Sequence, residues 1–237
     1  MNYDHSRFYN SIAEYCQMYN VPLENFLEIL EDQKVLPMIR GKAMEFIGCA
    51  IIQRYLDKSE WSVVKLNLNP QPGTQYDEDV SITHKRTGKR LKAEIKSSVR
   101  GSFKLKGRDI AVPFFNVKSH KSRSNKQHAH NDRYLATDFD VLLSNVSNAI
   151  FQGNTNKKGL DLIDSKEKIE CLKKHYNVNA DKDLVRSCYD DWRICLPQDI
   201  ALMDNTIPRT PPVRLDGGDV WFTPDQLENK LFSLIMP

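Results

Sequence analysis

The stretch 76–98 constrains the fold more than any other part of this 237-residue chain. Two runs of strand-forming residues flank Thr87-Gly88, where glycine supplies the unusual backbone angles of a tight turn. The pattern therefore predicts a β-hairpin. Side chains two apart in a strand point to the same face, so Glu94 and Lys96 are expected to lie together. With Thr87 and Gly88 as the two turn residues, Asp79 is expected to face Lys96 across the hairpin.

Two carboxylates and an ammonium group on one face of a hairpin suit a divalent cation. Mg²⁺ prefers oxygen ligands and often takes one or two carboxylates plus a substrate phosphate. Such a metal polarises phosphoryl oxygens, and a nearby lysine can hold the attacking water or neutralise charge. We therefore predict Asp79 and Glu94 as Mg²⁺ ligands and Lys96 as the residue that orients water. Asp77 and Glu78 are alternative ligands, but Glu78 is expected to point to the other side and Asp77 lies a full repeat further away.

This order of residues resembles the PD-(D/E)xK nuclease superfamily, whose core pattern is an acidic residue, a hairpin and then Glu-x-Lys. The matching residues are Asp79 and the tripeptide Glu94–Lys96, although Glu78 stands where the pattern has proline. The resemblance covers roughly residues 37–146, and Glu-x-Lys alone is a weak motif. Those nucleases often place a further glutamate on a helix before the first core strand. Glu45 occupies that position, so the resemblance implies a catalytic residue that supports the metal or its water; the alternative is a solvated helix residue.

The resemblance implies an α/β fold with a central mixed β-sheet flanked by helices. Within the superfamily the chain looks most like type II restriction endonucleases, which cut double-stranded DNA at a specific sequence. The resemblance to these enzymes also implies a homodimer, because two active sites must cut the two strands of a palindrome. The chain has no phosphate loop of the GxxxxGK[ST] type, so we expect no nucleotide cofactor.

Hydrophobic periodicity and turn residues predict the other elements. Helices are expected over 4–19, 22–30, 37–56, 165–176 and 224–234. Strands are expected over 61–68, 110–117, 139–146 and 191–197. We interpret 1–36 as an N-terminal helical segment, 37–146 as the nuclease core and 147–237 as C-terminal additions packed on the core, in one domain overall.

Positive charge is concentrated around the predicted metal site. Residues 85–126 hold fourteen Lys and Arg against two acidic residues, a balance of +12, so the rest of the chain carries −9 within a net charge of +3. A charge run is usually a solvated face, but a basic surround suits an anionic polymer such as DNA. Base or phosphate contacts are expected from two predicted loops, at Lys118, Lys121, Arg123, Asn125, Lys126, Gln127, Arg209 and Arg214.

Two other functions remain open from the sequence. The same core could belong to a structure-specific repair or junction nuclease. The chain could also be a non-catalytic DNA-binding protein, in which Glu94 and Lys96 would form a surface ion pair of little energetic worth. No stretch approaches the length of a membrane span and the first residues lack the apolar run of a signal peptide, so a cytoplasmic protein is expected.

Overall fold

The computed structural model describes residues 5–32, 34–66, 79–107, 112–120, 132–153 and 160–236. The chain forms two compact units, Met1–Ala43 and Met44–Pro237. The first unit contains the helices α1 (His5–Met18) and α2 (Phe26–Glu31), a short 3-10 turn between them, and the start of α3 (Leu36–Tyr55). None of the helices in the described ranges has the length and apolar character that a membrane span needs.

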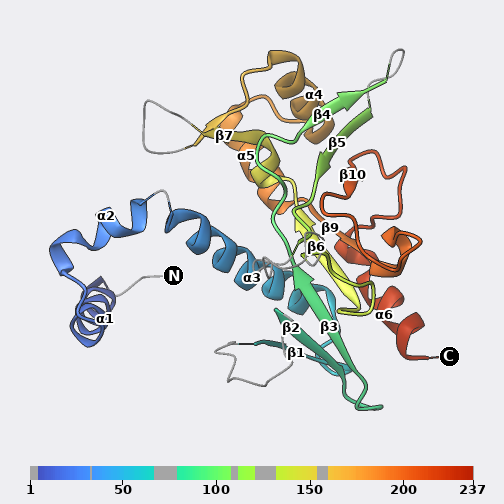
Figure 1. The fold of residues 1–237 in the computed structure, drawn as a ribbon, viewed down its shortest axis with the longest axis horizontal. Helices are drawn as coiled ribbons and strands as arrows, with labels where there is room; N and C mark the ends of the chain where they lie inside the picture. The colour runs from blue at the N-terminus through green and yellow to red at the C-terminus, as the bar shows by residue number, and fades with distance from the viewer. Residues whose placement is uncertain are drawn as a thin grey trace. The chain divides into compact units, whose positions relative to one another are not determined.

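The second unit is built on a five-stranded mixed sheet with the strand order β1-β2-β3-β6-β9 (Figure 1). β3 and β6 pair in parallel, whereas the other neighbours are antiparallel. The predicted fold class, an α/β core with a central mixed sheet flanked by helices, is therefore confirmed. The strands are β1 (Trp61–Lys65), β2 (Val80–His84), β3 (Arg90–Ile95), β6 (Val141–Asn145) and β9 (Trp192–Cys195).

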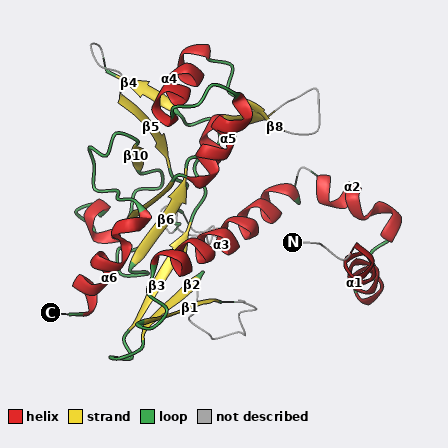
Figure 2. Ribbon diagram, turned by 180° about the vertical axis from the view of Figure 1, so that it is seen from behind, coloured by secondary structure: helices red, strands yellow, loops and turns green. Residues whose placement is uncertain are grey.

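Different elements cover the two faces of this sheet. α3 and the last helix α6 (Leu227–Ile235) pack on the first face, where they share a hydrophobic cluster with alternate residues of β2, β3, β6 and β9 (Figure 2). The second face has its own cluster, which draws on α4, α5 and a small antiparallel sheet of order β10-β5-β4. These elements are β4 (Lys104–Lys106), β5 (Val112–Asn116), α4 (Lys166–Tyr176), α5 (Asp181–Asp190) and β10 (Pro212–Arg214). A further hairpin joins β7 (Phe151–Gly153) to β8 (Leu160–Leu162).

β3 separates apolar from charged side chains by simple alternation. Leu91, Ala93 and Ile95 belong to the first-face cluster, so Glu94 and Lys96 point to the second face. The helix α3 lies very close to β3, because a Cβ added at Gly48 would sit 2.6 Å from Ile95 Cδ1. Packing on one face thus fixes the strand that presents the charged residues on the other.

The hairpin is longer than its sequence predicts. Val80 pairs with Ala93 and Thr83 with Arg90, a register that aligns Asp79 with Glu94 rather than with Lys96. The predicted two-residue turn is therefore wrong, and residues 85–88 form a four-residue loop closed by the bonds His84 N to Lys89 O and Gly88 N to His84 O. The error is two residues, an even number, so the predicted face is preserved.

A buried histidine explains the longer loop. The His84 ring is fully buried and lies 4.9 Å from the Trp61 ring. Its Nδ1 is 2.9 Å from Thr87 Oγ1 and its Nε2 is 3.3 Å from a Glu60 oxygen. These contacts hold Thr87 as the third residue of a four-residue loop. Gly88, with φ +68, is the last residue of that loop.

The C-terminal part of the chain contributes more to the sheet than the sequence suggests. β9 lies within the predicted strand 191–197 and forms one edge of the central sheet beside β6. The predicted core, 37–146, therefore lacks one strand of the sheet. The strands β4, β7, β8 and β10 were not predicted, because segments of three residues carry little periodic signal. α5 was also not predicted, although Leu184 and Cys188 recur at helical spacing.

We predict that Gly48→Ala destabilises the protein although alanine favours helices. Overpacking against Ile95 should cost about 1–3 kcal/mol, more than the gain of about 1 kcal/mol in helix propensity. Gly41→Ala is the matched control on the same helix, since nothing lies within 4 Å of a Cβ there. Urea unfolding should show a loss for Gly48→Ala and a gain for Gly41→Ala. Adding Ile95→Val to Gly48→Ala should restore part of the loss, because it removes the nearest atom.

Candidate active site

Glu94 is the centre of the candidate site. It lies in β3, the middle strand of the sheet, and is only 2% exposed although its side chain is a carboxylate. Lys96 forms an ion pair with Glu94 Oε1, and the Tyr134 hydroxyl donates to the same oxygen at 3.0 Å. The alternative in which Glu94 and Lys96 form a surface ion pair is therefore wrong.

Asp79 stands beside Glu94 at the start of β2. Its Oδ2 accepts a hydrogen bond from the backbone amide of Ile95 at 2.9 Å, and its carbonyl accepts one from Leu66 at 3.1 Å. The Asp79 carboxylate thus accepts the Ile95 amide in place of a backbone carbonyl, just beyond the last pair of the hairpin, Val80 with Ala93. This bond fixes the Asp79 carboxylate next to the Glu94–Lys96 segment. The alternative ligands Asp77 and Glu78 lie outside the described residues.

The electrostatics of Glu94 are those of a carboxylate that needs a cation. The pKa of Glu94 is raised to about 7, because burial and the nearby Asp79 charge raise it by more than Lys96 lowers it. Without positive charge beside it, Glu94 would have a still higher pKa and would be protonated at neutral pH. Lys96 supplies that charge in this structure.

Lys96 and Tyr134 both contact Glu94, and this contact raises the pKa values of both residues. Burial alone would lower the pKa of Lys96, but Glu94 and Tyr134 raise it above its usual range, so the ammonium form persists. Burial and the Glu94 charge raise the pKa of Tyr134, so its hydroxyl is a neutral donor. The Lys96 ammonium also lies 5.1 Å from the centre of the Tyr134 ring.

Sequence reasoning missed Tyr134. It lies 40 positions after Glu94, between a predicted loop and a predicted strand, and no local pattern marks it. Its place in the second-face hydrophobic cluster is a tertiary property. The parallel pairing of β3 with β6 brings the segment before β6 to the face that carries Glu94 and Lys96.

Glu45 lies at the same end of the sheet but joins a different contact. Its carboxylate forms an ion pair with Lys65 Nζ at 2.9 Å. Lys65 pairs with Val80, whose side chain belongs to the first-face cluster, so this ion pair is on the α3 side of the sheet. The structure therefore brings Asp79, Glu94 and Lys96 together on one face and sets Glu45 against the other.

The donor set fits a small hard cation. Across the described ranges no group of three or more His, Cys, Asp or Glu side chains forms a metal-binding cluster. Two carboxylates, Asp79 and Glu94, interact electrostatically at the site. Mg²⁺ is commonly held by one or two carboxylates and completes its shell with water and phosphate. Asp79 and Glu94 are thus the residues that would hold such an ion.

The predicted DNA-contacting residues fall into three groups. Lys118 is exposed, and its backbone amide donates to Ser97 O at 2.9 Å, so it flanks the end of the Glu94–Lys96 segment. Arg209 donates from Nη2 to Asp132 at 2.7 Å, and Arg214 pairs with Asp216. The remaining residues lie outside the described ranges: Lys121, Arg123, Asn125, Lys126 and Gln127.

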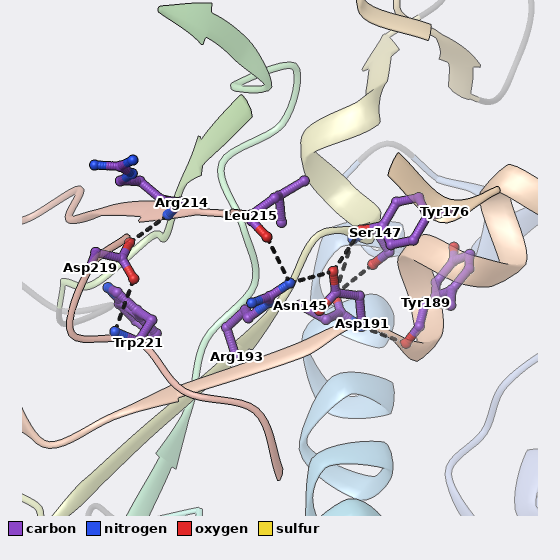
Figure 3. Close-up of polar contacts among 10 residues, drawn as sticks. All are labelled: Asn145, Ser147, Tyr176, Tyr189, Asp191, Arg193, Arg214, Leu215, Asp219 and Trp221. Atoms are coloured by element: carbon purple, nitrogen blue, oxygen red, sulfur yellow. Dashed lines mark hydrogen bonds and ion pairs between the residues drawn. The ribbon is translucent and has the colours of Figure 1, made fainter. Parts of the chain in front are cut away.

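A separate polar network holds the edge strand β9 in place. Arg193 binds Asp191 through two hydrogen bonds of 2.7 and 3.1 Å, and Asp191 also accepts the Tyr176 hydroxyl at 2.7 Å (Figure 3). In the same region the Arg214 backbone amide donates to Asp219, while its guanidinium points away from the network. This network ties α4, β9 and the loop after β10 together, and we regard it as structural.

No family model matches the chain, and no curated protein matches it. Among solved structures, it is similar to a bacterial homing endonuclease, I-Ssp6803I, with a TM-score of 0.27 and 20% sequence identity. The match covers 46% of this chain and 60% of the homing endonuclease, less than two thirds of its length.

We predict that Lys96→Met raises the pKa of Glu94 above about 7, because the positive charge that lowers it is lost. The carboxyl carbon of Glu94, assigned with Glu94→Gln, can be followed by NMR titration. The control is Lys92→Met. Lys92 lies two residues before Glu94 on the same face of β3, and its loss should shift the Glu94 titration far less. An unchanged Glu94 titration in Lys96→Met would contradict the electrostatic coupling.

Proposed function

We propose that this chain is a Mg²⁺-dependent DNA endonuclease of the PD-(D/E)xK type. The observation that supports the proposal best is the convergence of Asp79, Glu94 and Lys96 on one face of a central strand, with Glu94 buried. A buried carboxylate beside another carboxylate is costly for a fold. Carboxylates with perturbed pKa values cluster at functional sites.

Each residue has a separate part in phosphodiester hydrolysis. Asp79 and Glu94 would hold the Mg²⁺ ion, which when bound polarises phosphoryl oxygens and lowers the pKa of water. Lys96 would orient the attacking water and neutralise charge as it develops on the phosphate. Glu45 would not touch the reacting groups; its ion pair with Lys65 would hold the end of β1, where Leu66 donates to the Asp79 carbonyl.

Double-stranded DNA is the proposed substrate because basic side chains lead to the site. Arg90, Lys92 and Lys96 alternate with apolar residues along β3, so they share the face of Glu94. Lys118 adds an exposed charge next to the same segment. Lysine and arginine in such rows bind phosphates irrespective of sequence.

Sequence-specific cutting by a homodimer is the finer form of this proposal. Two-fold symmetry places one active site on each strand of a palindromic target. Two apolar residues of α3 support a second copy, since Phe46 and Ile47 are 60% and 42% exposed. Apolar side chains on the side of a helix away from its sheet often form protein interfaces.

We predict that Asp79→Asn, Glu94→Gln and Lys96→Met each reduce DNA cleavage by at least about 100-fold, because each removes charge needed in the transition state. The assay incubates unmethylated plasmid with the protein, with and without Mg²⁺, and resolves the products on a gel. Glu170→Gln on α4, an exposed carboxylate with only a surface ion pair, is the matched control and should retain full activity. Circular dichroism should show that all four variants are folded.

The products separate the candidate functions. Discrete Mg²⁺-dependent fragments support a sequence-specific endonuclease, whereas cutting confined to flaps, junctions or mismatches indicates a structure-specific nuclease. Binding without any cleavage would leave a DNA-binding protein. Full activity in Lys96→Met would overturn the role of that residue.

We predict that Lys118→Ala weakens DNA binding equally for different sequences, because the residue contacts phosphate. The plot of log affinity against log salt should lose about one unit of slope, the value expected for one phosphate contact. Lys182→Ala on α5 is a lysine control outside the site and should leave the slope unchanged. Fluorescence anisotropy, with Ca²⁺ in place of Mg²⁺ so that the DNA stays intact, measures the affinity and its dependence on salt. A loss restricted to one DNA sequence would instead indicate base contact.

A further inference from the structure

The two donors that hold Glu94 use the same oxygen. Lys96 and the Tyr134 hydroxyl both contact Glu94 Oε1. Among the residues that the structure describes, none donates a hydrogen bond to the other oxygen, Oε2. A carboxylate with one occupied oxygen presents the second one to a cation, as ligating carboxylates held by outer partners commonly do.

Lys96 and Tyr134 differ in how firmly they are held. The Lys96 side chain is 19% exposed and sits on a flexible stem. Tyr134 is 5% exposed, its ring meets the Phe139 ring edge-on at 5.2 Å, and its carbonyl accepts the Ile207 amide at 2.8 Å. Tyr134 is therefore the fixed donor, and Lys96 is the donor that can move.

This difference matters for the proposed reaction. The Lys96 ammonium has three donors, but while one of them stays on Glu94 Oε1 it reaches only a water or phosphate beside that oxygen. Once it turns towards the substrate, Glu94 keeps its orientation only if another donor retains Oε1. The Tyr134 hydroxyl is already in place to do so.

We propose that Tyr134 is a positioning residue that fixes Glu94 Oε1, so that Oε2 faces the metal and Lys96 is released for the reaction. This inference rests on the proposed function and adds a residue that the sequence pattern does not contain. Tyr134 itself touches neither water nor phosphate in this scheme.

The test is Tyr134→Phe, which removes the hydroxyl and keeps the ring against Phe139. Mn²⁺ serves as the probe, and its affinity is measured by electron paramagnetic resonance in the absence of DNA. We expect affinity to fall about 10- to 100-fold, the usual effect of losing an outer partner of a metal ligand. DNA cleavage should show the same shift in the Mg²⁺ concentration for half-maximal rate.

Tyr176→Phe is the matched control. Its hydroxyl also donates to a carboxylate, Asp191, at 2.7 Å, but in the network around β9 rather than at the site (Figure 3). It should lower the melting temperature without changing Mn²⁺ affinity. A purely structural role for Tyr134 would make the two variants behave alike.

The outcomes separate this inference from the proposed function. Wild-type Mn²⁺ affinity in Tyr134→Phe, with active wild-type enzyme, would overturn the positioning role alone. If the wild type binds Mn²⁺ but cuts no DNA, the proposed function fails, and weaker binding by Tyr134→Phe still supports the role of Tyr134. A wild type that binds no Mn²⁺ would overturn both.

Discussion

The burial of a carboxylate in the central strand is the constraint on which this structure depends. Glu94 is almost fully enclosed, so a charged donor and a neutral donor must both reach it. A buried charge without partners would cost several kcal/mol. The segments that carry Lys96 and Tyr134 must therefore adopt their observed arrangement, and the parallel pairing of β3 with β6 provides it.

The opposite face of β3 makes this arrangement rigid. Ile95 lies between Glu94 and Lys96 in sequence, donates its amide to Asp79 and packs its side chain against Gly48. One residue thus links the position of α3 to the position of both proposed metal ligands. Close packing transmits displacements, so a change at Gly48 is felt at the site although the helix lies on the other side of the sheet.

Sequence alternation was sufficient to find the face of the site but not its full content. Asp79, Glu94 and Lys96 share a face because strands have a period of two, and this survives the register error of two residues. The register itself depends on His84, whose burial against Trp61 is a tertiary contact. Tyr134 could not be predicted, because its contact with Glu94 joins residues 40 apart.

The central claim is that Asp79 and Glu94 Oε2 form the metal site. A crystal structure of the wild-type protein grown with Mn²⁺, with anomalous data, tests it most directly. The account predicts one anomalous peak between the Asp79 carboxylate and Glu94 Oε2, with the Tyr134 hydroxyl still on Oε1. A fully occupied ion elsewhere, or Glu94 still bound to Lys96 with no ion beside it at saturating Mn²⁺, would contradict it.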